Sequence, residues 1–327
     1  MLGLKIVSWN NALKNGLARL KPYLRWVFLG VALFFIGSAL SRHWGEVASI
    51  RLTVAGYGRL AIALLITLLA HTWSGWVWSW ILQDLNQAAI GSWGIRVYLR
   101  TNIAKYLPGN VWHFYGRVMA AKQAGFSVAA ATLSVVLESL LMAAAAVAIA
   151  LSSGIRENGL LQAVGLAIVL IGVHPRFLNP LIKIASKAKG KSIAAQSSES
   201  QSAEPRLEAA ESPVNHLRLQ RYPLRPLLGE AIFVLLRGTG FAVTLSALGG
   251  VAIEQVPQIL SAFSFAWVLG LVVPGAPGGI GVFEATAIAL LSAQISPGLI
   301  LAGVALYRLV SILAELTGAG MASLSRN

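Results

Sequence analysis

The sequence contains no cysteine, which excludes disulfides, thiolate catalysis and cysteine-ligated metal sites. Charged residues are also scarce: only 12% of the 327 residues are Asp, Glu, Lys or Arg, whereas an ordinary soluble domain carries about 25%. Hydrophobic residues make up 56% of the chain, and the mean hydropathy is +0.70. This balance predicts an all-α polytopic membrane protein. It leaves no room for a separate soluble catalytic domain of roughly 100 to 150 residues.

Acidic residues are fewer than basic ones, at 12 against 26, which gives a formal net charge of +14. The basic residues gather beside hydrophobic stretches, where they orient the chain and contact anionic lipid headgroups. We therefore expect membrane lipids, and not nucleic acid, as partners. The sequence also lacks an Asp-x-Asp pair, a His-Glu-x-x-His motif and a phosphate-binding loop. No catalytic residue, metal or cofactor is predicted.

Hydrophobic runs predict about seven to eight transmembrane helices, with one or two re-entrant or broken helices in addition. The first run, at about 26–40, follows a basic leader and is interpreted as an uncleaved signal anchor. The positive-inside rule then places the N-terminus in the cytoplasm. The expected location is the inner membrane. The predicted regions are a basic N-terminus (1–25), a first membrane half (26–183), a partly disordered cytoplasmic loop (184–225) and a second membrane half (226–327).

A run of glycine and proline interrupts the apolar sequence between Val273 and Glu284, which reads Val-Pro-Gly-Ala-Pro-Gly-Gly-Ile-Gly-Val-Phe-Glu. Proline removes backbone donors and glycine permits backbone angles that other residues resist, so this run is not an ordinary helix. In hydrocarbon, such a break is tolerated only where protein or water covers its unpaired backbone groups. The run therefore predicts a site whose hinge residues are Pro274, Gly275, Pro277, Gly278, Gly279 and Gly281.

A second interruption lies at 105–117, Lys-Tyr-Leu-Pro-Gly-Asn-Val-Trp-His-Phe-Tyr-Gly-Arg. Its hinge residues, Pro108 and Gly109, form a strong turn signal, and polar residues follow them at helical spacing. One interpretation is a re-entrant or interfacial element that binds an anionic headgroup between its flanking basic residues. The other is an amphipathic helix that rests on the lipid surface. The candidate binding residues here are Lys105, Asn110, His113 and Arg117.

Ionisable residues also occur inside the predicted spans. Glu138 lies in the middle of a long apolar run, where a carboxylate costs roughly 3 kcal/mol on insertion scales and normally faces a partner in the bundle interior. The same argument makes Arg237 and Arg308 site candidates, together with Glu284 at the end of the Gly/Pro break. Glu230, near the start of its span, is interpreted as an interfacial residue.

The two interruptions suggest a two-half repeat. Pro108 precedes Glu138, and Pro277 precedes Arg308, at separations that differ by one residue. Interrupted hydrophobic segments at matching positions in two halves indicate a transporter site near the membrane midplane. If the repeat is real, Glu138 and Arg308 lie at similar depth, and the sharpest prediction is an ion pair between them.

Three parts of the sequence resemble a known family: the Lys-Tyr-Leu-Pro-Gly-Asn-Val-Trp…Gly-Arg stretch (105–117), the Pro-Gly-Gly-Ile-Gly-Val-Phe-Glu stretch (277–284) and Tyr307-Arg308. They resemble the flippase-like membrane family found as the transmembrane region of lysylphosphatidylglycerol synthases. The resemblance covers most of the chain from about residue 20 and implies a role in moving a lipid or lipid-linked glycan between leaflets. The 327 residues contain no aminoacyl-transferase domain, so lysine transfer is not expected of them.

A lipid flippase or transporter is therefore the first functional hypothesis. Its polar path would be lined by the two interruptions and the charged residues within the spans. Two alternatives remain open: a non-catalytic membrane subunit that partners a lipid- or glycan-modifying enzyme, and an integral membrane transferase that uses a lipid-linked donor. The predicted disordered loop favours the subunit, while the scarcity of acidic residues disfavours the transferase.

Overall fold

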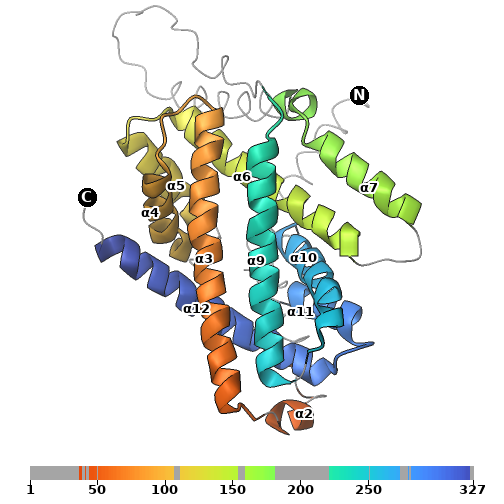
Figure 1. Cartoon of the computed structure of the whole chain (residues 1–327). Helices are drawn as coiled ribbons and strands as arrows, with labels where there is room; N and C mark the ends of the chain where they lie inside the picture. The colour runs from red at the N-terminus through yellow and green to blue at the C-terminus, as the bar shows by residue number, and fades with distance from the viewer. Residues whose placement is uncertain are drawn as a thin grey trace, which may run out of the picture.

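The computed structural model consists of packed helices (Figure 1). All regular elements within the described residues are helical, which confirms the all-α class. The described residues are 37–38, 41, 44–49, 51–106, 111–153, 159–180, 221–249, 251–272, 279 and 281–324.

Four helices in this part of the chain are long and apolar enough to cross a membrane. They correspond to apolar runs in the sequence at about 60–82, 127–151, 226–248 and 299–317, although α3 begins earlier and α12 ends later than its run. The predicted first span at 26–40 lies almost wholly outside the described residues. The four helices are α3 (Val54–Asp84), α6 (Val128–Ser153), α9 (Leu224–Leu248) and α12 (Pro297–Leu324).

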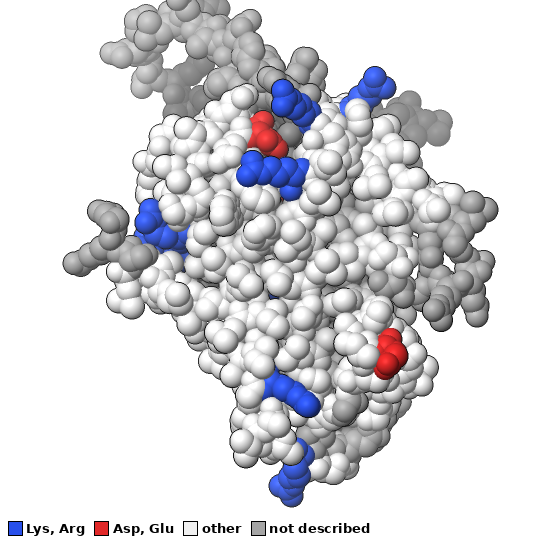
Figure 2. All heavy atoms as spheres, in the orientation of Figure 1, with Lys and Arg blue, Asp and Glu red and all other residues white. Residues whose placement is uncertain are grey.

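Helices α3 and α9 run side by side along most of their length, and α12 crosses them obliquely (Figure 1). Their outer faces carry exposed large apolar side chains, such as Leu65 and Leu69 on α3 and Leu228 and Leu235 on α9. Charged atoms on the visible face lie mostly toward its two ends, and its broad middle is almost uncharged (Figure 2). An apolar band between charged ends is the surface that a membrane-spanning bundle presents to lipid.

The first sequence interruption forms two short helices with a break between them. Helix α4 (Gly91–Asn102) continues into the 3-10 turn η1 (Ile103–Tyr106), and α5 (Trp112–Gln123) follows the undescribed residues 107–110. Twelve residues extend a helix by about 18 Å, which is too short to cross a hydrocarbon core of about 30 Å. Helix α4 packs against α3 and α12, and α5 packs against α6.

Close backbone approach fixes α4 against α3. A Cβ on Gly94 would lie 1.9 Å from Ser79 Oγ and 2.8 Å from the carbonyl oxygen of Gly75. Only glycine fits at this crossing, because any side chain would push the two helices apart. Helices α4 and α5 also pack against each other and are called the first hairpin, with η1 at its tip. This hairpin is therefore held at a defined height along α3.

The second interruption separates α10 (Val256–Val272) from α11 (Val282–Leu291). These two helices pack against each other and are called the second hairpin, whose tip includes Gly281 and Glu284. A short turn, η3 (Ile253–Gln255), precedes α10. Four aromatic rings join α9, α10, α11 and α12 in one core, with ring centroids 5.6 to 5.9 Å apart. This core holds α11 against α12 and comprises Phe241, Phe263, Phe283 and Tyr307. Helices α2 (Trp44–Ser49) and α7 (Gly159–Gly172) are also described.

Candidate functional site

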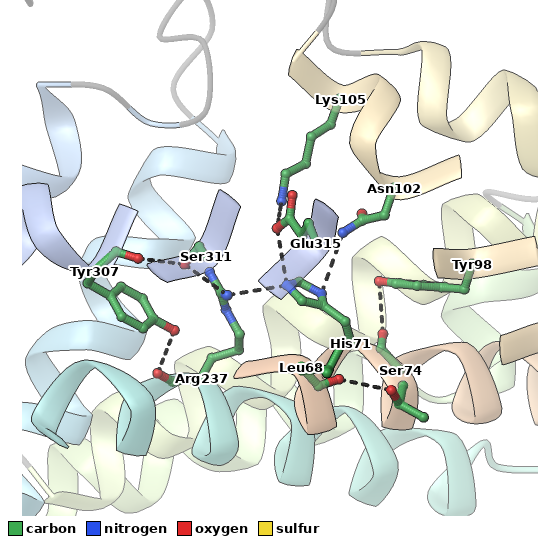
Figure 3. A network of polar contacts seen from close by, with 11 residues as sticks. Leu68, His71, Ser74, Tyr98, Asn102, Lys105, Arg237, Tyr307, Ser311 and Glu315 are labelled. Carbon is green, nitrogen blue, oxygen red and sulfur yellow. Dashed lines mark hydrogen bonds and ion pairs between the residues drawn. The ribbon is translucent and has the colours of Figure 1, made fainter. Parts of the chain in front are cut away.

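The tip of the first hairpin joins a carboxylate on α12 (Figure 3). Lys105 Nζ of η1 lies 2.5 Å from Glu315 Oε1, and His71 Nε2 of α3 lies 3.1 Å from the same oxygen. The Glu315 side chain is 1% exposed, whereas that of Lys105 is 27% exposed. One buried carboxylate therefore connects the hairpin, α3 and α12, while its lysine partner remains accessible.

The contacts of His71 define its neutral tautomer. Asn102 Nδ2 lies 3.5 Å from His71 Nδ1 and can only donate, so Nδ1 accepts. Nε2 then carries the proton and donates it to Glu315. Arg237 Nη1, 3.3 Å from Nε2, is consequently a close neighbour of the ring and not a hydrogen-bond donor to it.

Arg237 lies near the middle of α9 without an ion-pair partner among the described residues. Its Nη1 donates to Ser311 Oγ at 3.2 Å, and its guanidinium lies 5.0 Å from the centre of the Tyr307 ring. Tyr307 in turn donates to the Arg237 carbonyl oxygen at 2.8 Å. A half-buried guanidinium at this depth, which donates a hydrogen bond to a neutral hydroxyl and forms no direct ion pair with a described carboxylate, is a candidate anion ligand.

The strongest buried ion pair joins α5 to α6. Arg117 Nη1 lies 2.5 Å from Glu138 Oε2, and the two side chains are 2% and 3% exposed. The guanidinium also stacks 3.8 Å from the centre of the Tyr98 ring of α4. The predicted pair between Glu138 and Arg308 is therefore wrong: α5 packs directly on α6 and supplies the nearer cation.

Arg308 pairs instead within the second half. Its Nε and Nη2 lie 2.9 and 2.8 Å from Glu284 Oε1, and Glu284 Oε2 accepts from the Gly281 N–H at 2.7 Å. Gly281 adopts φ 86° and Gly279 adopts φ 70°, a region that glycine occupies without strain. Both of these predicted hinge residues therefore have backbone angles that other residues rarely adopt. The other predicted hinges, Pro108, Gly109, Pro274, Gly275, Pro277 and Gly278, and the binding candidate Asn110 lie outside the described residues.

Both hairpin tips meet α12 near its middle. Glu315 contacts the first tip and Arg308 contacts the second, and their spacing of seven residues places them about 10 Å apart on one face of the helix. His71 likewise lies near the middle of α3. Contacts with the middles of long helices, instead of their ends, favour the re-entrant interpretation of 105–117 over a surface helix.

Lys105 and His113 lie outside the four long helices, and burial lowers the pKa of both side chains. For the Lys105 ammonium, the nearby Glu315 carboxylate opposes this effect of burial. Burial also lowers the pKa of His113 to about 3, and the Arg117 charge acts in the same direction. His113 is 7% exposed, and its Nδ1 has no hydrogen-bond partner among the described residues. It is therefore neutral near pH 7 and cannot contribute a positive charge to a site.

A groove of about 530 Å³ opens between the ends of α3 and α9 that lie nearest Tyr222. Its walls are apolar, and its rim carries charges of both signs. The Arg225 guanidinium lies 4.2 Å from the centre of the Trp80 ring. Such a groove has apolar walls and a charged rim, which match the acyl chains and the headgroup of a phospholipid. The lining residues that matter here are Trp73, Trp80, Asp84, Arg221 and Arg225.

Four polar residues of these networks were missed or undervalued by the sequence reasoning. Glu315 and His71 carried a signal, since each is a titratable group inside an apolar span. Glu230 was interpreted as interfacial, but it is 0% exposed. Asn102 had no signal, because a single amide in an amphipathic segment is ordinary. Within the described part of the chain, no group of three or more His, Asp or Glu side chains could hold a metal ion.

The fold and these networks define a multi-pass, all-α membrane protein with ion pairs inside the bundle at two helix breaks. A family model for the lysylphosphatidylglycerol synthase TM region matches residues 24–317. The chain belongs to this family, which confirms the resemblance in the sequence motifs and makes it an integral membrane protein of a lipid-related family. A comparison with curated proteins finds no match.

Proposed function

We propose that this protein moves an anionic phospholipid or a lipid-linked glycan between the leaflets of the inner membrane, without catalytic residues of its own. The observation that carries the proposal is Arg237, a guanidinium near the middle of α9 that no carboxylate of the described residues neutralises. An unpaired cation at this depth is unfavourable and is typical of substrate pathways. A lipid phosphate would supply the missing negative charge.

The surrounding charges support the same substrate class. Among the described residues, three partly exposed cations, Lys105, Arg237 and Arg308, lie with two carboxylates that pair with members of this set, Glu315 and Glu284. The three cations come from η1, α9 and α12, so a phosphate between them would contact both halves of the protein. The excess of one positive charge favours an anionic headgroup over a neutral one.

In this proposal, the groove between α3 and α9 is the entrance for the lipid. Its indole walls match acyl chains and the glycerol region, and its arginines match a phosphate. In the proposed orientation, with the N-terminus and the 184–225 loop in the cytoplasm, this groove lies at the cytoplasmic end of the bundle. Lipid would then be captured from the inner leaflet.

The test is lipid movement in proteoliposomes that contain the full-length protein. Fluorescent phosphatidylglycerol, phosphatidylethanolamine and a polyprenyl-phosphate sugar are incorporated in parallel, and a membrane-impermeant quencher reports their transfer between leaflets. We expect the wild-type protein to move at least one anionic lipid and Arg237→Met to move it at least tenfold more slowly. Arg59→Met is the matched control, because Arg59 is an exposed arginine near the start of α3.

Two results would contradict the proposal. Wild-type protein that moves none of the three lipids would favour a subunit that partners a lipid- or glycan-modifying enzyme. Equal rates for wild type and Arg237→Met would remove the unpaired guanidinium from the pathway. Metal-dependent formation of a new lipid product would instead favour a transferase.

A further inference from the structure

A carboxyl group on α9 is buried without any partner. Glu230 is 0% exposed, and neither of its two carboxyl oxygens has a hydrogen-bond partner among the described residues. An ionised carboxylate in this position would lack water, hydrogen bonds and a counter-ion at the same time. Such a group is strongly disfavoured inside a protein, and it becomes neutral by binding a proton.

The groups around Glu230 show why it has no cation of its own. The Arg117 and Glu138 charges both act on Glu230, but Arg117 is already paired with Glu138 at 2.5 Å. Helix α9 also packs against α3, α10 and α12. Of the titratable groups on α3 and α12, His71 and Glu315 bind each other, Asp84 lines the groove with Arg225 and Arg308 pairs with Glu284. Helix α10 (Val256–Val272) contains no titratable side chain. One guanidinium therefore serves two carboxyl groups.

Arg117 retains an unused donor. Its Nη1 contacts Glu138, while its Nε is buried and has no hydrogen-bond partner among the described residues. A planar guanidinium can bind two acceptors on different edges. Arg117 is thus able to exchange Glu138 for Glu230 as its carboxylate partner, provided that the proton moves in the opposite direction.

We propose that Glu230, Glu138 and Arg117 form a proton-binding site in which the two carboxyl groups share one proton. In the present conformation Glu230 holds the proton and Glu138 is the carboxylate paired with Arg117. When Arg117 changes partner, Glu230 gives up the proton and becomes the paired carboxylate, and Glu138 takes up a proton. The cluster stays electrically neutral in both states, as a buried site requires.

This site also suggests an energy source, a step that rests on the proposed function. If Glu230 exchanges protons with one side of the membrane and Glu138 with the other, each change of partner releases a proton to one side and takes one up from the other, so a proton gradient favours one of the two states. A proton gradient would then drive lipid movement. The proton-binding site itself does not depend on lipid transport and can be tested without it.

The first experiment uses dicyclohexylcarbodiimide, which modifies protonated carboxyl groups in apolar surroundings. Full-length protein is treated near pH 7, and its peptides are analysed by mass spectrometry for the N-acylurea adduct. Glu284 is the internal control, because it is buried but paired with Arg308. We expect at least tenfold more modification at Glu230 than at Glu284, with less at alkaline pH. Equal modification, or none at Glu230, would overturn the proposal.

Infrared spectroscopy provides a second readout that needs no reagent to enter the bundle. A protonated carboxyl group absorbs at a higher frequency than a carboxylate, and the band shifts in heavy water. The band should be present in wild type and Glu284→Gln but absent in Glu230→Gln. Its absence in wild type, or its persistence in Glu230→Gln, would also overturn the proposal.

Vesicles with an imposed pH gradient separate this inference from the proposed function. Faster lipid movement under the gradient in wild type, lost in Glu230→Gln, would support proton coupling. Lipid movement that ignores the gradient would overturn the coupling but leave the proposed function intact. Protonated Glu230 in a protein that moves no lipid would overturn the proposed function but leave the proton site intact.

Discussion

The sharing of Arg117 by two carboxyl groups predicts a specific non-additivity in stability. The perturbation is Glu138→Gln, made in the wild type and again in the Glu230→Gln background. Removing one partner of a buried ion pair typically destabilises a protein by about 3 to 5 kcal/mol, since the remaining charge has no counter-ion. Arg117 is 2% exposed, so water cannot compensate for the missing carboxylate.

In the wild-type background, Glu230 should reduce the destabilisation caused by Glu138→Gln. There it can release its proton and pair with Arg117, whereas in the Glu230→Gln background the guanidinium has no carboxylate left. We therefore expect Glu138→Gln to be about 1 to 3 kcal/mol less destabilising in the wild type, the range typical of residues that share a partner. Glu230→Gln alone should be the mildest change, because glutamine has the shape of a protonated glutamate.

The assay is reversible unfolding of the four proteins by SDS in mixed micelles, followed by tryptophan fluorescence. The free energies of unfolding form a double-mutant cycle, whose interaction term is the measured quantity. Equal destabilisation by Glu138→Gln in both backgrounds would refute the reasoning, since it would mean that Glu230 cannot replace Glu138. Arg117→Met with Glu138→Leu serves as the control that removes both charges together and should recover most of the lost stability.

Three further predictions follow from single positions. Arg237→Met should leave the free energy of unfolding unchanged or raise it. The change removes from the bilayer interior a cation that has no ion-pair partner among the described residues, and it loses a hydrogen bond worth about 1 kcal/mol. A large destabilisation in SDS unfolding would argue for a structural role. Gly281→Ala should destabilise by roughly 1 to 2 kcal/mol through its φ of 86°, and an unchanged SDS midpoint would contradict this. Gly94→Ala should destabilise by about 1 to 3 kcal/mol through overpacking, since its Cβ would lie 2.8 Å from an α3 carbonyl oxygen. Gly58→Ala, where nothing lies within 4 Å, is the matched control, and equal thermal stability of the two variants would show that α4 can move aside.

The sequence predicted the helices well where one physical effect dominates. Apolar runs identified α3, α6, α9 and α12, because a span must satisfy its backbone internally and cover its length with apolar side chains. Proline and glycine correctly located both breaks, because they act on the backbone directly. The extent of α12 was underestimated: the helix continues to Leu324 past Gly318 and Gly320, and glycine is typical of a helix end.

Ion-pair partners could not be predicted in the same way. Each charged residue inside an apolar run could be recognised from the sequence by itself. The candidates identified in this way were Glu138, Arg237, Glu284 and Arg308. Their pairing depends on which helices pack together, and this is determined by contacts such as that between α5 and α6. The presumed repeat matched Glu138 with Arg308 by sequence spacing alone. Each residue instead binds the hairpin helix beside it, since a buried charge pairs with the nearest opposite charge that the packing supplies.

The two halves do resemble each other in how charge is used. In each, an ion pair fixes one arm of a broken hairpin to the long helix beside it: Arg117 with Glu138 in the first half, and Glu284 with Arg308 in the second. Helix α12 adds a contact between the two halves. Glu315, which lies on the same face of α12 as Arg308, binds Lys105 at the tip of the first hairpin. A helix is stiff over the two turns that separate these contacts. Any sliding or rotation of α12 must therefore change both tips together, which is the mechanical link that alternating exposure of a single central site requires.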